Sequence, residues 1–326
     1  MIRVGVLRGG TSNEFKISIK SGGNIIANLP KDSYSAVDIF VARDGTWHIG
    51  GTPKQMEEIP LHIDVAFNTL HGDYGEDGRV SEILEDLNVP YIGSRAVPSS
   101  LAVNKRLSRD ILKKAGIKVP PGVALEDYRE SLLGKSREGK IKELALKIFG
   151  TIPPPWVLKP ARGGSSINTT VAKSFGELVA GLHALFDYGG DLVVEQYIRG
   201  KEVSSGVIEN FRRERHYPLM PVEVRNKEDI FDHLKKQSPD LTCPSFMSHD
   251  EKAAVSDLAV KAHKVLGLRD WSVSDFIVTP RGIYLLEVNN NPKCSSSSII
   301  AKSLEAVGSN VGELADHLIS LALGRK

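Results

Sequence analysis

Cysteines, long apolar runs and an excess of charge of either sign are all scarce in this sequence. The two cysteines, Cys243 and Cys294, lack the paired spacing of a disulfide framework or a zinc site. No apolar run reaches the roughly 18 residues that a membrane-spanning helix needs. The opening IRVGVL is too short for the apolar part of a signal peptide and is expected to form a strand. These features predict a reduced, cytoplasmic protein.

The charges of the sequence are almost balanced. Lysine and arginine number 42 against 40 aspartates and glutamates, which gives a formal net charge of +2. Without an overall field, neither nucleic acid nor a membrane surface is expected as a partner. Hydrophobic residues make up 41% and charged residues 25%, as in ordinary globular proteins, and 326 residues suffice for two or three domains.

The first hundred residues alternate between strand and helix patterns. A β-branched run at residues 2–7 precedes a glycine turn and a helix, and a buried strand at 64–70 precedes another glycine loop and helix. This order predicts a small α/β domain with a parallel sheet, ending near residue 95. The two glycine loops, 8–12 and 71–78, follow strands, where parallel sheets bind their ligands.

The rest of the chain is expected to mix helices with antiparallel strands. One capped helix is predicted to end at Gly116. Residues 191–198 and 201–209 alternate like the strands of a hairpin that turns at Gly200. The segment 225–247 is polar and irregular, which predicts a long surface loop or lid.

The stretch LLEVNNNPKCSSSS, residues 285–298, begins as an apolar strand and continues in oxygen-bearing side chains. The strand that opens this stretch is the second strand of a predicted hairpin over 273–289. If the strands pair antiparallel, Asp275 lies near Glu287, and Asn289 shares a face with Glu287. Two carboxylates and an amide suit Mg²⁺ shared with phosphates. The alternative is that the acids lie on the solvated edge of a sheet.

A lysine and a glycine-rich loop supply the complementary chemistry. Lys159 ends the strand WVLKP, and the loop 163–166 has backbone N–H groups able to wrap a phosphate, although it is not a P-loop. A glycine hairpin beside a surface lysine is the equally weighted alternative. Glu195 and Glu202 lie across a short turn, where they could accept hydrogen bonds from an adenine amino group and from ribose hydroxyls. The alternative is that both are solvated acids of an ordinary hairpin.

Two residues of the N-terminal loops have both a structural and a functional interpretation. Glu14 lies three residues after Thr11, the spacing of a capping box at the first helix. Alternatively, its carboxylate pairs with a substrate ammonium. His71 is either a local turn residue or a polar group beside the reacting centre. Neither residue decides the matter alone.

The order of these segments is more informative than any one of them. GGTSNE, HGDYGEDG, the pair NK, VLKPARGGSS, VVEQYIRGKE and SDF…LLEVNNNP together resemble the D-alanine–D-alanine ligase family of ATP-grasp enzymes, essentially from end to end. HGxxGEDG followed by a helix and PYIGS is quite specific to that family. The resemblance implies an ATP-grasp fold, α/β with an α+β body, behind an N-terminal parallel-sheet domain. The implied domains are 1–96, 97–192 and 193–326.

The resemblance also implies an activity. ATP would phosphorylate the carboxylate of one D-alanine, and the amine of a second would attack the acyl phosphate, giving a dipeptide for peptidoglycan precursors, ADP and phosphate. The partners would be small molecules, D-alanine or similar. The cofactors would be ATP and Mg²⁺, with two ions and with Mn²⁺ as an alternative. A homodimer is expected from the family only.

Matched position by position, the resemblance assigns roles to residues of this chain. The nucleotide would be bound by Lys105, Lys159, Glu195, Tyr197, Ile198, Glu202 and, in the predicted lid, Lys236. The metal ligands would be Asp275, Glu287 and Asn289. The catalytic centre would include Glu14 and Ser165, which hold the amino end of the first substrate, with His71 nearby. Near the carboxylate of the second substrate would lie Ser298 and Ile299.

Three positions at the reaction centre depart from the family pattern. Val273 stands two residues before Asp275, where the family has an arginine of the oxyanion pocket. Lys293 follows Pro292 in place of glycine, and Gln237 replaces the tyrosine of the lid. In one interpretation Lys293 restores the lost cation and is itself catalytic. In another, the pocket is rebuilt for a different amino acid or a 2-hydroxy acid. The third is a nucleotide-binding regulatory protein without turnover.

Overall fold

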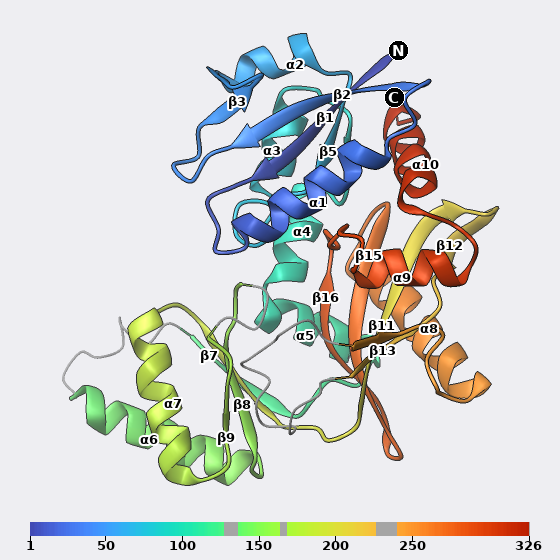
Figure 1. The fold of residues 1–326 in the computed structure, drawn as a ribbon. Coiled ribbons are helices and arrows are strands. Elements are labelled where there is room, and N and C mark those ends of the chain that lie inside the picture. Colours follow the sequence, from blue (N-terminus) through green and yellow to red (C-terminus); the bar gives the residue numbers. More distant parts are fainter. Residues whose placement is uncertain (127–135, 164–167, 226–239, 326) are drawn as a thin grey trace.

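The computed structural model describes residues 1–126, 136–163, 168–225 and 240–325. Its strands form three sheets that follow one another along the chain (Figure 1). Among the described residues both cysteines are free thiols, as expected from their spacing. The same part of the chain contains no helix with the length and apolarity needed to cross a membrane.

The first sheet is mostly parallel. Its strand order is β4-β3-β2-β1-β5-β6, in which β1 pairs parallel with β2 and β5, and β5 with β6. The parallel sheet is therefore confirmed, and the antiparallel strands β3 and β4 extend one edge. Its elements are β1 (Ile2–Gly9), α1 (Phe15–Asn28), β2 (Tyr34–Val41), β3 (Trp47–Ile49), β4 (Thr52–Lys54), the 3₁₀ turn η1 (Met56–Glu58), α2 (Ile59–His62), β5 (Val65–Asn68), α3 (Arg79–Asp86) and β6 (Tyr91–Ile92).

Two helices lead from the first sheet to the second, α4 (Ala96–Val103) and α5 (Lys105–Lys114). The prediction of one helix up to Gly116 is wrong, because the backbone is extended at Asn104. The side chain of Asn104 accepts from the N–H groups of Arg106 and Leu107 and so caps α5. The break places Lys105 at the first position of α5.

The second sheet is antiparallel, with the order β7-β10-β8-β9. Helices α6 and α7 pack against each other and against this sheet, and Ile148, Leu158 and Leu182 lie in the shared core. The elements are β7 (Gly122–Leu125), α6 (Arg137–Thr151), β8 (Trp156–Pro160), β9 (Thr170–Ala172), α7 (Phe175–Tyr188) and β10 (Leu192–Gln196).

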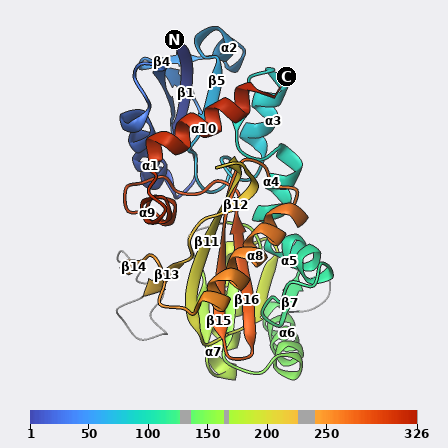
Figure 2. The same cartoon turned by 90° about the vertical axis from the view of Figure 1, so that its right-hand side faces the viewer.

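The third sheet is also antiparallel, in the order β14-β13-β11-β15-β16, with β12 on β11. Helix α8 covers it (Figure 2). The predicted hairpin of 191–198 with 201–209 is wrong, because β10 belongs to the second sheet and β11 to the third; the chain crosses between the sheets there. The elements are β11 (Lys201–Phe211), β12 (Glu214–Pro218), β13 (Val222–Arg225), β14 (Asp240–Thr242), α8 (His249–Val265), β15 (Trp271–Thr279) and β16 (Gly282–Asn289).

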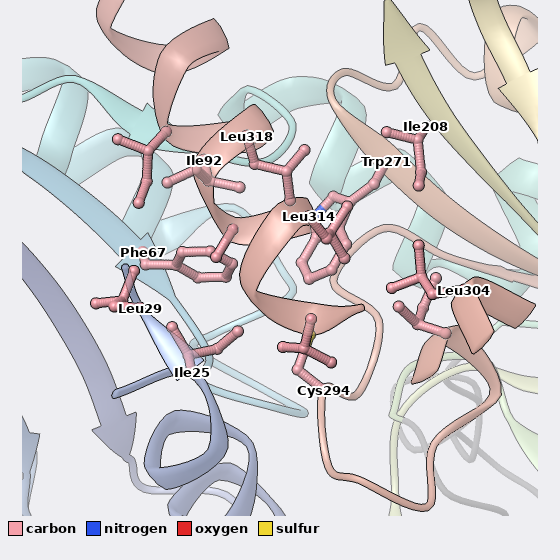
Figure 3. Packing of buried hydrophobic residues seen from close by; sticks show 14 of the residues in the cluster. Ile25, Leu29, Phe67, Ile92, Ile208, Trp271, Cys294, Leu304, Leu314 and Leu318 are labelled. Atoms are coloured by element: carbon pink, nitrogen blue, oxygen red, sulfur yellow. The ribbon is translucent and has the colours of Figure 1, made fainter. Parts of the chain in front are cut away.

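A hydrophobic core joins the first sheet to the third. After α9 (Ile299–Ala306), the last helix, α10 (Val311–Leu323), returns to pack on β5 and β6. Figure 3 shows Ile25 and Phe67 meeting Leu314 and Trp271 in this core. The rings of Phe67 and Trp271 meet edge to face with centroids 5.9 Å apart, a geometry that adds about 0.5–1.5 kcal/mol to the burial of apolar area. The two sheets are thus held together, and loops from both meet beside this core.

Candidate active site

Two carboxylates and an amide share one face of the β15–β16 hairpin. Asp275 lies opposite Glu287, and Val273 lies opposite Asn289, so the predicted pairing of the acids is confirmed. The register shifts immediately after Asp275, which is the mark of a bulge. Ser204, on the neighbouring strand β11, donates from Oγ to Oδ1 of Asp275 at 2.5 Å and orients this carboxylate.

The donor set fits a hard cation such as Mg²⁺. Carboxylate and amide oxygens are the ligands that Mg²⁺ takes in proteins, usually with several waters or phosphate oxygens completing its shell. Glu287 lies on the edge strand with 43% of its side chain exposed. Oδ1 of Asn289 accepts from the N–H of Asn291 at 2.8 Å, which fixes the amide. Among the described residues there is no group of three or more histidines, cysteines or acids that could hold a metal ion.

Lys105, whose side chain is 12% exposed, lies beside one of the metal-type carboxylates. Nζ of Lys105 donates to the carbonyl oxygen of Gly163 at 2.5 Å and lies 3.8 Å from Oε2 of Glu287. Burial lowers the pKa of Lys105, and the negative charge of Glu287 opposes that shift. A lysine beside oxygen ligands is an arrangement in which one phosphate can contact both. Glu287 itself is exposed on the edge strand, as the alternative interpretation also expects.

Lys159 belongs to a buried charge cluster. Its Nζ lies 2.6 Å from Oε2 of Glu195, and Arg109 forms an ion pair with Oε1 of the same carboxylate. The guanidinium of Arg109 also donates to the carbonyl oxygen of Pro120 at 2.7 Å. Only 3% of the Glu195 side chain is exposed, so it is not the solvated acid of the alternative interpretation. Glu195 therefore orients Lys159 in addition to any contact with a base.

The segment between β10 and β11 crosses from the second sheet to the third. The N–H of Tyr197 donates to the carbonyl oxygen of Pro155 at 2.8 Å, and burial raises the pKa of the Tyr197 phenol. Ile198 is half-buried in the crossing, and Glu202 lies on β11 opposite Ile277. A nucleotide between the two sheets would meet these residues. Ser165, Lys236 and Gln237 lie outside the described residues.

Glu14 lies at the N-cap of α1. The capping-box interpretation is wrong: α1 is capped at Glu14 itself, without a side-chain hydrogen bond. The carboxylate is buried beside the loop that follows β5. Gly72, at φ +74°, leaves room for it, since a Cβ there would lie 3.1 Å from Oε2 of Glu14 and 2.9 Å from Oγ of Ser12.

His71, in the same loop after β5, is a buried polar residue. Its Nε2 is 2.9 Å from Oγ of Ser21, and its Nδ1 is 3.3 Å from Oε1 of Glu76. Ser21 in turn accepts from the N–H of Cys294 at 3.2 Å. His71 therefore connects helix α1, the loop 71–78 and the segment after β16, which a simple turn residue would not do.

The asparagines after β16 attach this segment to the first sheet. Asn290 donates to the carbonyl oxygen of Glu76 at 3.1 Å, and Asn291 donates to that of Leu70 at 2.9 Å. The negative charge of Glu76 also opposes the lowering of the Lys105 pKa. Hydrogen bonds thus attach the segment from Leu70 to Glu76, which lies beside Glu14, to the residues that directly follow β16.

Lys293 and Val273, the two described departures from the family pattern, differ in their surroundings. Nζ of Lys293 lies 3.2 Å from Oε1 of Glu14. Val273 is buried in the core that joins the first and third sheets. The lysine is therefore beside the residue expected to bind a substrate ammonium, and the valine contributes no charge to the hairpin.

Ser298 and Ile299 begin helix α9. Oγ of Ser298 accepts from the N–H of Ala301 at 3.2 Å, so its first role is that of an N-cap. Ile299 packs against the joining core. The backbone N–H groups of this helical turn remain suited to a carboxylate.

Sequence reasoning missed several residues of the site. Arg109 stands four residues after Lys105 on α5, so the i, i+4 spacing of two cations on one helix face was the available signal. Ser21 and Asn24, which contacts the Cys294 carbonyl oxygen at 2.6 Å, carried no signal, because their partners lie some 270 residues away.

A domain with a mostly parallel sheet in front of two antiparallel sheets is the architecture of an ATP-grasp protein. Here Lys159 lies on a strand of the second sheet, the oxygen ligands lie on strands of the third, and Lys105 begins α5. Comparison with known proteins gives the family. Residues 3–60 and 51–94 match the model of the D-ala D-ala ligase N-terminus, and residues 111–320 match that of the D-ala D-ala ligase C-terminus. The chain belongs to the D-alanine–D-alanine ligase family.

Individual relatives cover the whole chain. It is 34% identical over 328 residues to D-alanine–D-alanine ligase from Syntrophotalea carbinolica, covering 99% of this chain and 97% of the relative. A structure of D-alanine–D-alanine ligase from Bacillus anthracis complexed with ATP has 27% identity and a TM-score of 0.78, covering 99% and 98%. The VanG D-Ala:D-Ser ligase from Enterococcus faecalis, at 24% identity, shares the fold with a TM-score of 0.82, covering 98% and 99%.

Proposed function

We propose that this protein joins two D-alanine molecules at the expense of ATP. The observation that carries the proposal is the pair of charged groups at the two ends of the site. They are Glu14, a buried carboxylate fit for an ammonium, and Lys105, 3.8 Å from Glu287. One end suits an amino acid and the other suits a nucleotide phosphate with its metal, so a carboxylate lying between them would be placed for phosphorylation.

The reaction proceeds in two balanced steps. A carboxylate oxygen of the first D-alanine attacks the γ-phosphorus of ATP, ADP leaves, and an acyl phosphate remains. The amine of the second D-alanine, having lost its proton, attacks the acyl carbon, and phosphate leaves with the electron pair of the C–O bond. The product is the dipeptide. Glu14 with Ser165 holds the amino end of the first substrate, and the turn at Ser298 and Ile299 receives the carboxylate of the second.

The nucleotide is proposed to lie between the second and third sheets. The ATP bound by the Bacillus anthracis relative supports this ligand. Lys105, Lys159 and, from the lid, Lys236 offset phosphate charge, whereas Tyr197, Ile198, Glu195 and Glu202 surround the base and ribose. Arg109 keeps Glu195 against Lys159 and acts as a positioning residue.

Two Mg²⁺ ions would be held by Asp275, Glu287 and Asn289. Mn²⁺ could take the place of Mg²⁺. Bound there, the metal would neutralise charge on the phosphates. The chain itself orients these ligands, through the hydroxyl of Ser204 and the N–H of Asn291.

Further assignments follow from the family. The domains are proposed to be 1–96, 97–192 and 193–326, with α10 packed back on the first sheet. A homodimer is proposed as the assembly. Because the reaction consumes ATP and D-alanine, the protein is proposed to act in the cytoplasm and to supply a peptidoglycan precursor.

Product analysis tests the proposed function. Purified protein with ATP, Mg²⁺ and D-alanine should release equal amounts of ADP, phosphate and D-alanyl-D-alanine, measured by coupled assay and mass spectrometry. A panel of other amino and 2-hydroxy acids runs beside it. Activity only with another compound would show a rebuilt pocket. ATP binding without any product would contradict the ligase proposal and favour a regulatory protein.

A further inference from the structure

The ion pair between Glu14 and Lys293 places a second ammonium where a substrate ammonium is expected. Their Oε1 and Nζ atoms lie 3.2 Å apart. The carboxylate is only 5% exposed, whereas 37% of the Lys293 side chain is exposed. A buried carboxylate that already binds an alkylammonium group has the chemistry to bind the ammonium of an amino acid instead.

The backbone of Lys293 is held in place while its side chain has access to solvent. On one side, Asn291 donates to the carbonyl oxygen of Leu70; on the other, the N–H of Cys294 donates to Ser21. The carbonyl oxygen of Cys294 accepts from Asn24 at 2.6 Å. Movement at this position is therefore confined to the four-carbon stem of the lysine, which can swing without disturbing the segment.

The third sheet offers a reason for such a movement. Val273 lies opposite the metal-type ligand Asn289 and two residues before Asp275, yet it is apolar and buried in the core. A donor carboxylate that is being phosphorylated there gains from a cation. Lys293, four residues after Asn289 and in contact with Glu14, is placed to supply one if it is released.

We propose that Lys293 is exchanged by the substrate. The ammonium of the first amino acid takes the place of Lys293 on Glu14, and the freed ammonium of Lys293 moves to the donor carboxylate. Glu14 keeps an ammonium partner before and after, so the exchange leaves no buried carboxylate without a countercharge. This proposal rests on the proposed function, and it makes Lys293 a residue that determines the donor class.

The exchange discriminates between donors by charge. A 2-hydroxy acid has a neutral hydroxyl, which cannot replace an ammonium on Glu14, so Lys293 stays on Glu14 and the donor carboxylate lacks its cation. An amino acid releases the lysine. The selectivity for amino donors is therefore predicted to appear in turnover and to depend on Lys293.

Lys293→Met tests the exchange, with Lys302→Met as a matched control. Lys302 is an exposed lysine of α9 whose Nζ lies 2.9 Å from Glu305. D-Alanine and D-lactate are compared as donors, with D-alanine as acceptor. For Lys293→Met we expect kcat with D-alanine to fall about 10²–10³-fold, as for the loss of one oxyanion donor. The dissociation constant of D-alanine, measured by calorimetry with a non-hydrolysable ATP analogue, should fall as well, because its competitor at Glu14 is gone. The kcat with D-lactate should change little.

The other outcomes contradict the exchange. Weaker binding of D-alanine to Lys293→Met with unchanged kcat means that the lysine only supports Glu14. A higher kcat means that it is a blocking group. If the wild-type protein forms no dipeptide, the proposed function fails, but calorimetry still tests the exchange. The exchange is overturned if D-alanine binds Lys293→Met no more tightly than it binds the wild-type protein. Wild-type ATP affinity and thermal midpoint in both variants show that they are folded.

Discussion

Glutamine at position 195 should destabilise the protein and weaken ATP binding. Glu195→Gln keeps the shape of the side chain but removes the negative charge shared by Arg109 and Lys159. Because the two cations contact the two oxygens of one carboxylate, they lie roughly 5 Å apart, and at an effective dielectric constant near 20 their repulsion is about 3 kcal/mol. Removing one partner of a buried ion pair typically costs about 3–5 kcal/mol. We expect the free energy of unfolding to fall by about 3 kcal/mol.

Urea denaturation followed by circular dichroism measures this change, and calorimetry measures the ATP dissociation constant, which should rise about tenfold or more because Lys159 loses its orientation. Glu126→Gln is the control: its side chain is 78% exposed beside Arg106, so stability should change by no more than about 0.5 kcal/mol. Wild-type stability and ATP affinity in Glu195→Gln would mean that the buried charge cluster has no energetic role.

Three further predictions concern the loop 71–78, the metal ligands and an ionisable phenol. Gly72→Ala should lower the free energy of unfolding by about 1–2 kcal/mol, because Gly72 has a φ of +74°. It should also raise the KM for D-alanine, because the new Cβ presses on Glu14. Gly308→Ala, at φ +68° and in open space, should lower stability alone, and an equal KM in the two variants would contradict this. Ser204→Ala should weaken Mg²⁺ binding about 10–100-fold. The Mg²⁺ dependence of ADP release measures this affinity, and an unchanged dependence would mean that the Ser204 hydroxyl does not orient Asp275. Burial and the hydrogen bond to Glu85 raise the pKa of Tyr91 to about 12, against about 10 in an unfolded chain. This contribution to stability is therefore complete below about pH 10 and is lost as the pH rises towards 12; a Tyr91 phenolate absorbance that titrates near pH 10 would contradict it.

Local patterns in the sequence predicted the first parallel sheet and the metal-type hairpin. The alternation along residues 273–289 and the turn between its strands determine the register, so Asp275 and Glu287 could be paired without a structure. The first parallel sheet followed from β-branched runs that end in glycine loops. Such signals are carried by neighbouring residues, which is why they are legible.

Long-range contacts explain what the sequence could not predict. The strands 191–198 and 201–209 have the pattern of a hairpin, yet they enter different sheets, because pairing partners for both come from elsewhere in the chain. The break at Asn104 depends on a side-chain cap that competes with a continuous helix. The contact of Lys293 with Glu14 joins residues nearly 280 positions apart, and the sequence around either residue does not predict the other as its partner.

Transfer of ¹⁸O from the substrate to phosphate shows whether ATP activates a donor carboxylate as an acyl phosphate. D-Alanine labelled with ¹⁸O in both carboxylate oxygens is incubated with the protein, ATP and Mg²⁺, and the released phosphate is analysed by mass spectrometry. We expect one ¹⁸O in each phosphate and one dipeptide for each phosphate, because the bridging oxygen of the acyl phosphate leaves with phosphorus. Phosphate without label, or label in AMP, would contradict the account, since ATP would then be hydrolysed by water or cleaved at its α-phosphorus.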